Sequence, residues 1–163
     1  MGMQLPGELI GLLGMLGYTW PEADETKLFE IGSTWLEFAG TVQGVASEAG
    51  SAAQQVWSGN QGQDIDAFRK AWGEDDAPAG ILQDAGTGAM AVGACFFVCA
   101  AIVLALKIQV IVQLVMLAIE IAQAVATAVV TFGASLAEIP IFKEITGMII
   151  DLLIDQAIGA LLG

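Results

Sequence analysis

Residues 88–137 read GAMAVGACFFVCAAIVLALKIQVIVQLVMLAIEIAQAVATAVVTFGASLA and contain only two charged side chains, Lys107 and Glu120. Within this stretch, residues 89–106 form an uninterrupted run of apolar or small residues. The run is near the lower limit of the length that spans a bilayer as a helix. It therefore predicts a helix that is covered either by protein or by lipid.

The second half of the stretch carries a polar stripe. Its polar positions follow one another at steps of three, four or seven residues, and they are Gln109, Gln113, Glu120, Gln123, Thr127 and Thr131. At 100° per residue they share one narrow face, and the rest of the helix is Ile, Val, Leu and Ala. We expect a mostly buried helix with one polar seam. Two interpretations stay open, the central helix of a soluble bundle and a bilayer helix whose seam faces a partner helix or an aqueous path.

Composition and charge exclude some classes of partner. Hydrophobic residues make up 56% of the 163-residue chain, its mean hydropathy is +0.71 and its formal charge is −13. Thirteen of the eighteen acids and three of the five bases precede residue 85. Because no basic patch is present to neutralise phosphates, we expect no nucleic-acid partner and no attraction to anionic lipid.

The sequence also argues against catalysis and metal binding. The chain contains no His, which removes Ser/His and Cys/His mechanisms and the His ligands of most zinc sites. Its two cysteines, Cys95 and Cys99, lie four residues apart inside the apolar run, and we expect them to be small buried hydrophobes. We predict no catalytic residue, no cofactor and no metal site, so the chain is not expected to be an enzyme.

Upstream of this stretch, a helical hairpin is indicated. A heptad seam at alternating steps of three and four comprises Leu28, Ile31, Trp35, Phe38, Val42, Val45, Ala49, Ala52 and Val56. It predicts a helix of about 35 residues that packs along another long helix. The turn Trp57-Ser58-Gly59 follows, and then a second helical pattern. We expect Gly59 to adopt the left-handed conformation that ends a helix.

These patterns predict an all-α fold, an elongated helix hairpin with a Trp-x-Gly tip that is packed to or followed by a strongly apolar helical bundle. A short helix is expected within residues 5–17 and an amphipathic one after Pro140, with two helices across residues 88–137. The predicted domains are a hairpin arm, residues 1–80, and an apolar region, residues 81–163, which together form one continuous structural unit.

The order of these features resembles the WxG and PPE-like substrates of type VII secretion. More closely, it is similar to the N-terminal domain of actinobacterial polymorphic toxins related to the mycobacterial channel-and-toxin protein. The elements that carry the resemblance are Leu5-Pro6-Gly7-Glu8-Leu9, Trp20-Pro21-Glu22, Val56-Trp57 with Gly59, Ala67-Phe68 with Trp72, Asp75-Asp76-Ala77-Pro78 and Ile139-Pro140-Ile141-Phe142. The resemblance implies that this piece is the N-terminal part of a larger toxin.

In such families, the hairpin tip and an aromatic-x-x-x-acid element form a composite export signal. By position, Trp57 and Gly59 match the tip. Trp72 and Asp76 match the second element, with Trp in place of Tyr, and Tyr18 and Glu22 have the same spacing but precede the long helix. The resemblance thus implies a non-catalytic targeting domain, read by secretion machinery or a helical partner protein.

The alternative function is a membrane-inserting or oligomeric channel-forming translocation domain, for which residues 88–162 would associate with a membrane or with further copies of the chain. The first residues have neither a basic segment nor a small-residue cleavage site, so they are not a secretory signal peptide. We therefore expect a secreted or cell-surface protein that uses a signal-peptide-independent route, with membrane association left open.

Overall fold

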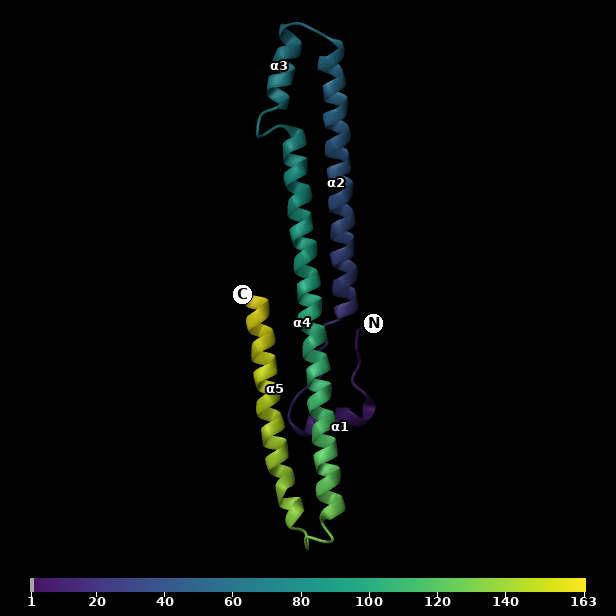
Figure 1. The fold of residues 1–163 in the computed structure, drawn as a ribbon, viewed down its shortest axis with the longest axis vertical. Helices are drawn as coiled ribbons and strands as arrows, with labels where there is room; N and C mark the ends of the chain where they lie inside the picture. The colour runs from purple at the N-terminus through teal and green to yellow at the C-terminus, as the bar shows by residue number, and fades with distance from the viewer. Residues whose placement is uncertain (1) are drawn as a thin grey trace. The chain divides into compact units, whose positions relative to one another are not determined.

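The computed structural model describes residues 2–163, which form helices and turns but no strand. Five α-helices and one short 3-10 helix follow one another along the chain (Figure 1). They are α1 (Gly7–Met15), α2 (Glu25–Gly59), α3 (Gln63–Trp72), α4 (Pro78–Thr127), η1 (Ala134–Glu138) and α5 (Ile139–Leu162). The predicted all-α fold with a long helical hairpin is confirmed.

One helix, α4, replaces the two that were expected across residues 88–137, so that expectation was wrong. α4 runs without interruption from Pro78 to Thr127. The glycines in its first half each cost about 1 kcal/mol relative to alanine, but two of them, Gly86 and Gly93, are buried against α2. Their packing keeps the helix continuous, and the chain turns only at Phe132 and Gly133, which have φ of 53° and 86°.

The described chain contains two compact units. One comprises residues 28–98, and the other comprises the residues up to Lys27 together with Cys99–Gly163. We call them the hairpin unit and the terminal unit. The predicted division between residues 1–80 and 81–163 stays a prediction.

In the hairpin unit, small residues hold α2 against α4. The buried positions of α2 recur every seven residues and are Gly32, Ala39, Ala46 and Ala53. A Cβ on Gly32 would lie 3.1 Å from the carbonyl oxygen of Gly93, and one on Gly86 would lie 3.4 Å from that of Ala39. The two backbones therefore approach closely, in the manner that small residues permit.

The predicted seam of α2 is consequently only partly correct. The large side chains of Ile31, Trp35, Phe38 and Val45 are exposed rather than packed along α4. The buried line lies one residue further along the helix, at Gly32, Ala39, Ala46 and Ala53. The heptad period was correctly predicted, but the face that meets α4 was not.

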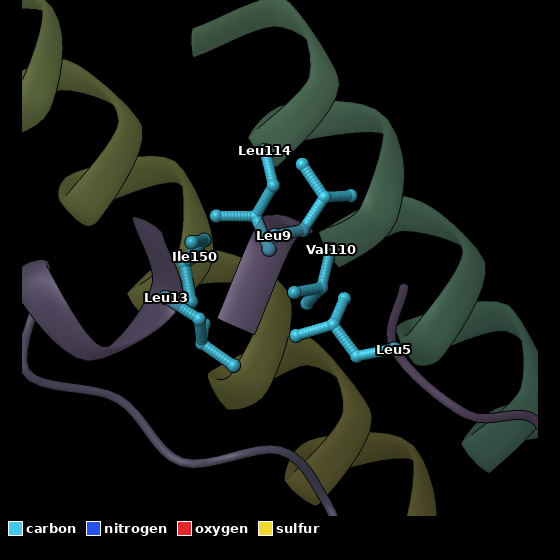
Figure 2. Packing of buried hydrophobic residues seen from close by; sticks show 6 residues of the cluster. All are labelled: Leu5, Leu9, Leu13, Val110, Leu114 and Ile150. Carbon is cyan, nitrogen blue, oxygen red and sulfur yellow. The ribbon is translucent and has the colours of Figure 1, made fainter. Parts of the chain in front are cut away.

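In the terminal unit, α1 packs against α4 and α5 (Figure 2). The core consists of the six side chains that Figure 2 labels, which are Leu5, Leu9, Leu13, Val110, Leu114 and Ile150. α5 begins with a proline in its first turn, as the sequence predicted. α5 packs against α4 through Ile150, which shares the core with Val110 and Leu114, and it leaves Ile145 and Met148 exposed.

A buried ion pair fixes the start of α2 to α4 within the terminal unit. The Lys107 Nζ lies 2.8 Å from Glu25 Oε2 and donates a 2.6 Å hydrogen bond to the carbonyl oxygen of Ala23. Glu25 also accepts a hydrogen bond from the Met3 amide, and the Trp20 ring centroid lies 5.8 Å from Nζ. Lys107 is only 2% exposed, so it belongs to the interior rather than to a polar surface.

A tyrosine provides the second polar anchor of the terminal unit. The Tyr18 hydroxyl donates to Asp151 Oδ1 at 2.7 Å, and the carbonyl oxygen of Gly147 lies 3.0 Å away. The hydrogen bond to Asp151, together with burial and the negative charge of that carboxylate, raises the pKa of Tyr18 to about 12. The contact joins the segment after α1 to the middle of α5.

Candidate functional site at the hairpin tip

Three aromatic rings join the end of α2 to α3. The ring centroids of Trp57 and Phe68 are 5.8 Å apart, and those of Phe68 and Trp72 are 5.7 Å apart. All three side chains are half-buried, although α3 has no fully buried residue. These distances are typical of favourable aromatic pairs. Because Trp57 packs on Phe68, it holds α3 in place and still presents part of its indole to solvent.

The turn at the tip is made differently from the prediction. Gly59 is the last residue of α2, and it does not have the positive φ that we expected of it. Asn60 Nδ2 instead donates a 2.8 Å hydrogen bond to the carbonyl oxygen of Val56, and Gly62, with φ of 140°, makes the sharp bend before α3. A Cβ on Gly59 would meet no atom within 4 Å, so the turn itself does not require glycine there.

The second predicted element is divided between two environments. Trp72 ends α3 inside the aromatic cluster, whereas Asp76 is exposed in the turn before α4. An open cavity of about 450 Å³ lies beside Trp72 and is lined by acidic residues that include Glu74, Asp75 and Asp84. Asp76 does not line this cavity. The structure therefore brings Trp57 and Trp72 together through Phe68, and it leaves Asp76 and Gly59 on the surface.

The predicted polar seam lies along the second half of α4. Gln113 and Glu120 are half-buried, whereas Gln109, Gln123 and Thr127 are exposed. Gln109 lines a small groove of about 150 Å³ between α4 and α5, which also contains Gln156. Thr127 donates a 2.9 Å hydrogen bond to the carbonyl oxygen of Gln123 in its own helix.

The expectation of a mostly buried helix around this seam was wrong, because only one face of α4 is buried. One face of α4 is buried through Lys107, Val110, Leu114, Leu117 and Ala124. The opposite face is apolar yet exposed, and its large side chains are Ile108, Val112, Val115, Met116 and Ile119. The seam lies between these two faces. Cys95 and Cys99, which we expected to be buried, are exposed and half-buried free thiols.

The sequence did not predict the roles of two residues that organise these regions. Phe68 is one of the residues that carry the family resemblance, but its role in joining Trp57 to Trp72 depends on the path of the turn. Lys107 is recognisable in the sequence only as one of the two charged side chains of residues 88–137, and its partner Glu25 lies 82 residues away. No local pattern marks that pairing, although an isolated lysine in an apolar run is itself a signal that a partner is needed.

Residues 2–163 contain no cluster of three or more His, Cys, Asp or Glu side chains that could hold a metal ion. The features described above are instead an aromatic tip, an acidic turn and exposed apolar helix faces. Such surfaces are suited to contacts with other proteins or with lipid.

Comparison with known proteins identifies the family. No curated protein and no solved structure matches the chain. The family model described as a WXG100 like domain matches residues 4–148, which is nearly the whole chain. Proteins of this family are generally non-enzymatic helical proteins that form helical dimers or work with the secretion machinery. The chain therefore belongs to the WXG100-like family and is a type VII secretion-related protein.

Proposed function

We propose that this chain is the non-catalytic targeting domain through which a type VII apparatus exports an attached toxin. The observation that carries the proposal is the cluster of Trp57, Phe68 and Trp72, which presents partly exposed indole rings at the end of a helical hairpin. A rigid, half-buried aromatic ring supplies contact area to a partner at little cost in conformational entropy. Trp57 and Gly59 form the recognised tip, with Trp72 and Asp76 as the second element.

Gly59 has a specific role in this proposal. Because a Cβ there would meet no atom within 4 Å, the fold tolerates a side chain, so any requirement for glycine comes from the recognising partner. The partner would approach the backbone of α2 at this position, next to Trp57. The exported form would reach the cell surface or the medium by this route.

Trp57→Ala is expected to lower export at least tenfold, because truncating a buried interface aromatic commonly costs 2 kcal/mol or more of binding. Export is measured as the fraction of the protein in the medium of a host with an active type VII system, with a cytoplasmic marker to exclude lysis. Gly59→Val tests the backbone approach in the same assay. Circular dichroism and thermal melting show whether each variant keeps the hairpin.

Phe132→Ala provides the control, because Phe132 is 98% exposed and belongs to the terminal unit, in the turn after α4, rather than to the hairpin unit. It should be exported like the wild type. Export of a folded Trp57→Ala protein at the wild-type level would refute the proposal.

A second candidate function is membrane insertion by the terminal unit. The observation that favours it is the pair of exposed apolar rows, Ile108, Val112, Val115 and Ile119 on α4 and Ile141, Ile145, Met148 and Leu152 on α5. Both helices are long and apolar enough to cross a membrane. If lipid covers these rows, the seam with Gln113 and Glu120 would face a neighbouring helix or an aqueous path.

This candidate predicts that the detergent-free chain floats with vesicles of neutral phosphatidylcholine and resists alkaline carbonate. Val112→Glu with Val115→Glu should lower the floated fraction at least tenfold, because each buried charge at a bilayer centre costs about 3 kcal/mol. Thr127→Glu, in the exposed part of the polar seam, is the control and should float normally. Recovery of the wild-type chain as a soluble species that does not bind vesicles would rule this function out.

A further inference from the structure

The turn that joins α4 to α5 (Figure 1) exposes three large apolar side chains. Val129, Val130 and Phe132 are 86%, 81% and 98% exposed. Among residues 2–163, Leu162 in the last turn of α5 is the only other large apolar side chain that is more than 60% exposed. Turns that face water usually consist of Gly, Pro, Asn, Asp and Ser, so this surface is suited to a different environment. We call residues 128–133 the apolar turn.

The backbone conformation of Phe132 also indicates that the apolar turn makes a contact outside the chain. Its φ of 53° lies in the left-handed region, which glycine, Asn and Asp adopt readily and bulky residues rarely do. The ring is almost fully exposed, so packing against its own chain does not explain a phenylalanine at this position. Residues held in such conformations are concentrated at functional sites. A contact with an external surface accounts for the ring.

Polar groups around the apolar turn are bonded within the chain. The buried Ser135 hydroxyl donates a 2.7 Å hydrogen bond to the carbonyl oxygen of Ala124, and Thr131 Oγ1 accepts a 3.3 Å hydrogen bond from the Ser135 amide. The amide of Gly133 donates to the carbonyl oxygen of Ala128 at 2.7 Å. Lipid requires such internal pairing of polar groups, because the hydrocarbon core provides no water to replace it.

The charges and helices next to the apolar turn indicate which surface covers it. Residues 121–137 carry no charge, and the first charged side chains on either side are those of Glu120 and Glu138. A specific protein interface usually includes about one hydrogen bond per 100–200 Å², whereas the hydroxyls here are already bonded. Both helices that meet at the turn are long and apolar enough to cross a membrane, so the apolar surface continues beyond it. Lipid therefore fits the turn best, and the two glutamates favour neutral headgroups over anionic ones.

We propose that the apolar turn enters one leaflet of a neutral bilayer, with the side chains of Val129, Val130 and Phe132 among the lipid chains. Interfacial apolar segments penetrate about 5–10 Å, to the boundary between headgroups and acyl chains. The inference goes beyond the second candidate function, which concerns the exposed rows along α4 and α5. The turn can enter a leaflet whether or not the two helices cross the membrane, so either statement can fail without the other.

The test measures where single positions of the whole chain lie relative to the bilayer of phosphatidylcholine vesicles. An environment-sensitive fluorophore is attached to Val129→Cys, in a chain that also carries Cys95→Ala and Cys99→Ala to remove the natural thiols. When vesicles are added, its emission should rise about twofold or more, and a nitroxide near the lipid headgroup should quench it more than one at the end of the acyl chain. Replacing about a third of the lipid with phosphatidylglycerol should weaken binding about fivefold at low salt.

Val130→Glu with Phe132→Glu should lower the vesicle-bound fraction at least about tenfold, because both side chains would carry charge into the lipid. Leu161→Glu with Leu162→Glu is the matched control, since these leucines are 45% and 83% exposed and lie at the opposite end of α5. It should bind vesicles like the wild type. Thermal melting checks that the variants keep the fold.

A second label, at Val112→Cys in the row of α4, separates this inference from the second candidate function. Entry of the Val129 label alone would support the apolar turn and argue against spanning helices, whereas entry of both labels would support both. If the Val112 label entered lipid while the Val129 label stayed in water, lipid would cover the rows instead and the proposal would be overturned. It would equally be overturned if neither label left water, if the two glutamate variants bound equally, or if phosphatidylglycerol strengthened binding.

Discussion

Replacing Lys107 with alanine is expected to lower the free energy of unfolding by about 3 kcal/mol. The Lys107 Nζ is the 2.8 Å partner of Glu25 Oε2, and the two side chains are 2% and 7% exposed. Without the ammonium group, the buried Glu25 carboxylate loses its cation and keeps hydrogen bonds from backbone amides such as that of Met3. An unpaired buried charge is costly, and domains of this size have only about 5–15 kcal/mol of stability in total. Urea titration followed by circular dichroism measures the loss.

The same pair gives a pH dependence with a definite sign. Burial raises the pKa of the Glu25 carboxyl, but hydrogen bonds from Lys107 and the Met3 amide outweigh it, so the pKa lies below its ordinary value of 4.5. The pair therefore contributes its full stability above pH 4.5 or so, and that contribution is lost as the pH falls through the lowered pKa. In Lys107→Ala this part of the acid dependence should be reduced.

Lys143→Ala is the control for this prediction. Lys143 is only half-buried and its Nζ lies 3.9 Å from the Met15 sulfur, so its removal should change stability by less than about 0.5 kcal/mol. The double variant Glu25→Leu, Lys107→Met should recover much of the loss, because neither charge is then left unpaired. Equal melting of Lys107→Ala and the wild type would show that the pair does not hold the terminal unit together.

Gly93→Leu is expected to destabilise the hairpin unit by about 2–3 kcal/mol, because it overpacks the point where α2 and α4 approach most closely. Even a Cβ at this position would lie 3.0 Å from the carbonyl oxygen of Gly32 and 3.1 Å from Leu36 Cδ2. The carbonyl is backbone and cannot rotate away, so the helices must separate. Chemical denaturation measures the change, and analytical ultracentrifugation checks that the variant stays monodisperse to the same degree as the wild type.

Gly88→Ala, on the same helix, is expected to change the free energy of unfolding in the opposite direction. A Cβ on Gly88 would meet no atom within 4 Å, so the gain in helix propensity of up to about 1 kcal/mol is not opposed by a clash. This variant should be as stable as the wild type or more stable. If Gly93→Leu and Gly88→Ala shifted stability in the same direction, close contact at Gly93 would not be what holds the two helices together.

The sequence predicted the length of α2 well, because its heptad period is strong and its ends carry clear turn residues. It did not predict which face of α2 meets α4. Large residues dominate a pattern search, whereas the contact is made by Gly32, Ala39, Ala46 and Ala53, whose small side chains carry little hydrophobic signal. The large side chains that form the seam in the sequence, such as Ile31 and Phe38, are exposed instead.

Neither the continuity of α4 nor the ion pair of Lys107 could be predicted from the neighbouring residues in the sequence. Glycine in a helix is unfavourable by itself, and only the approach of α2 shows why Gly86 and Gly93 are tolerated. At the tip, the sequence marked Trp57, Phe68 and Trp72 but did not predict that the Phe68 ring packs between the two indoles. It also assigned the bend to Gly59, whereas Gly62 makes it. The continuity of α4, the pairing of Lys107 and the packing of Phe68 each depend on a contact between segments that are separate in the sequence, whereas the bend at Gly62 is a local feature of the turn.

The contact of Tyr18 with Asp151 has an optical consequence. Tyr18 is the only tyrosine of the chain, so tyrosinate absorbance reports on a single place in the molecule. Folded molecules ionise this phenol near pH 12, whereas a released segment ionises near the ordinary value of 10.0. Between these two pH values ionisation favours release, so the contact loses its stabilising contribution as the pH rises. The tyrosinate absorbance between these two pH values therefore measures, without any label, the fraction of molecules in which the N-terminal segment has separated from α5.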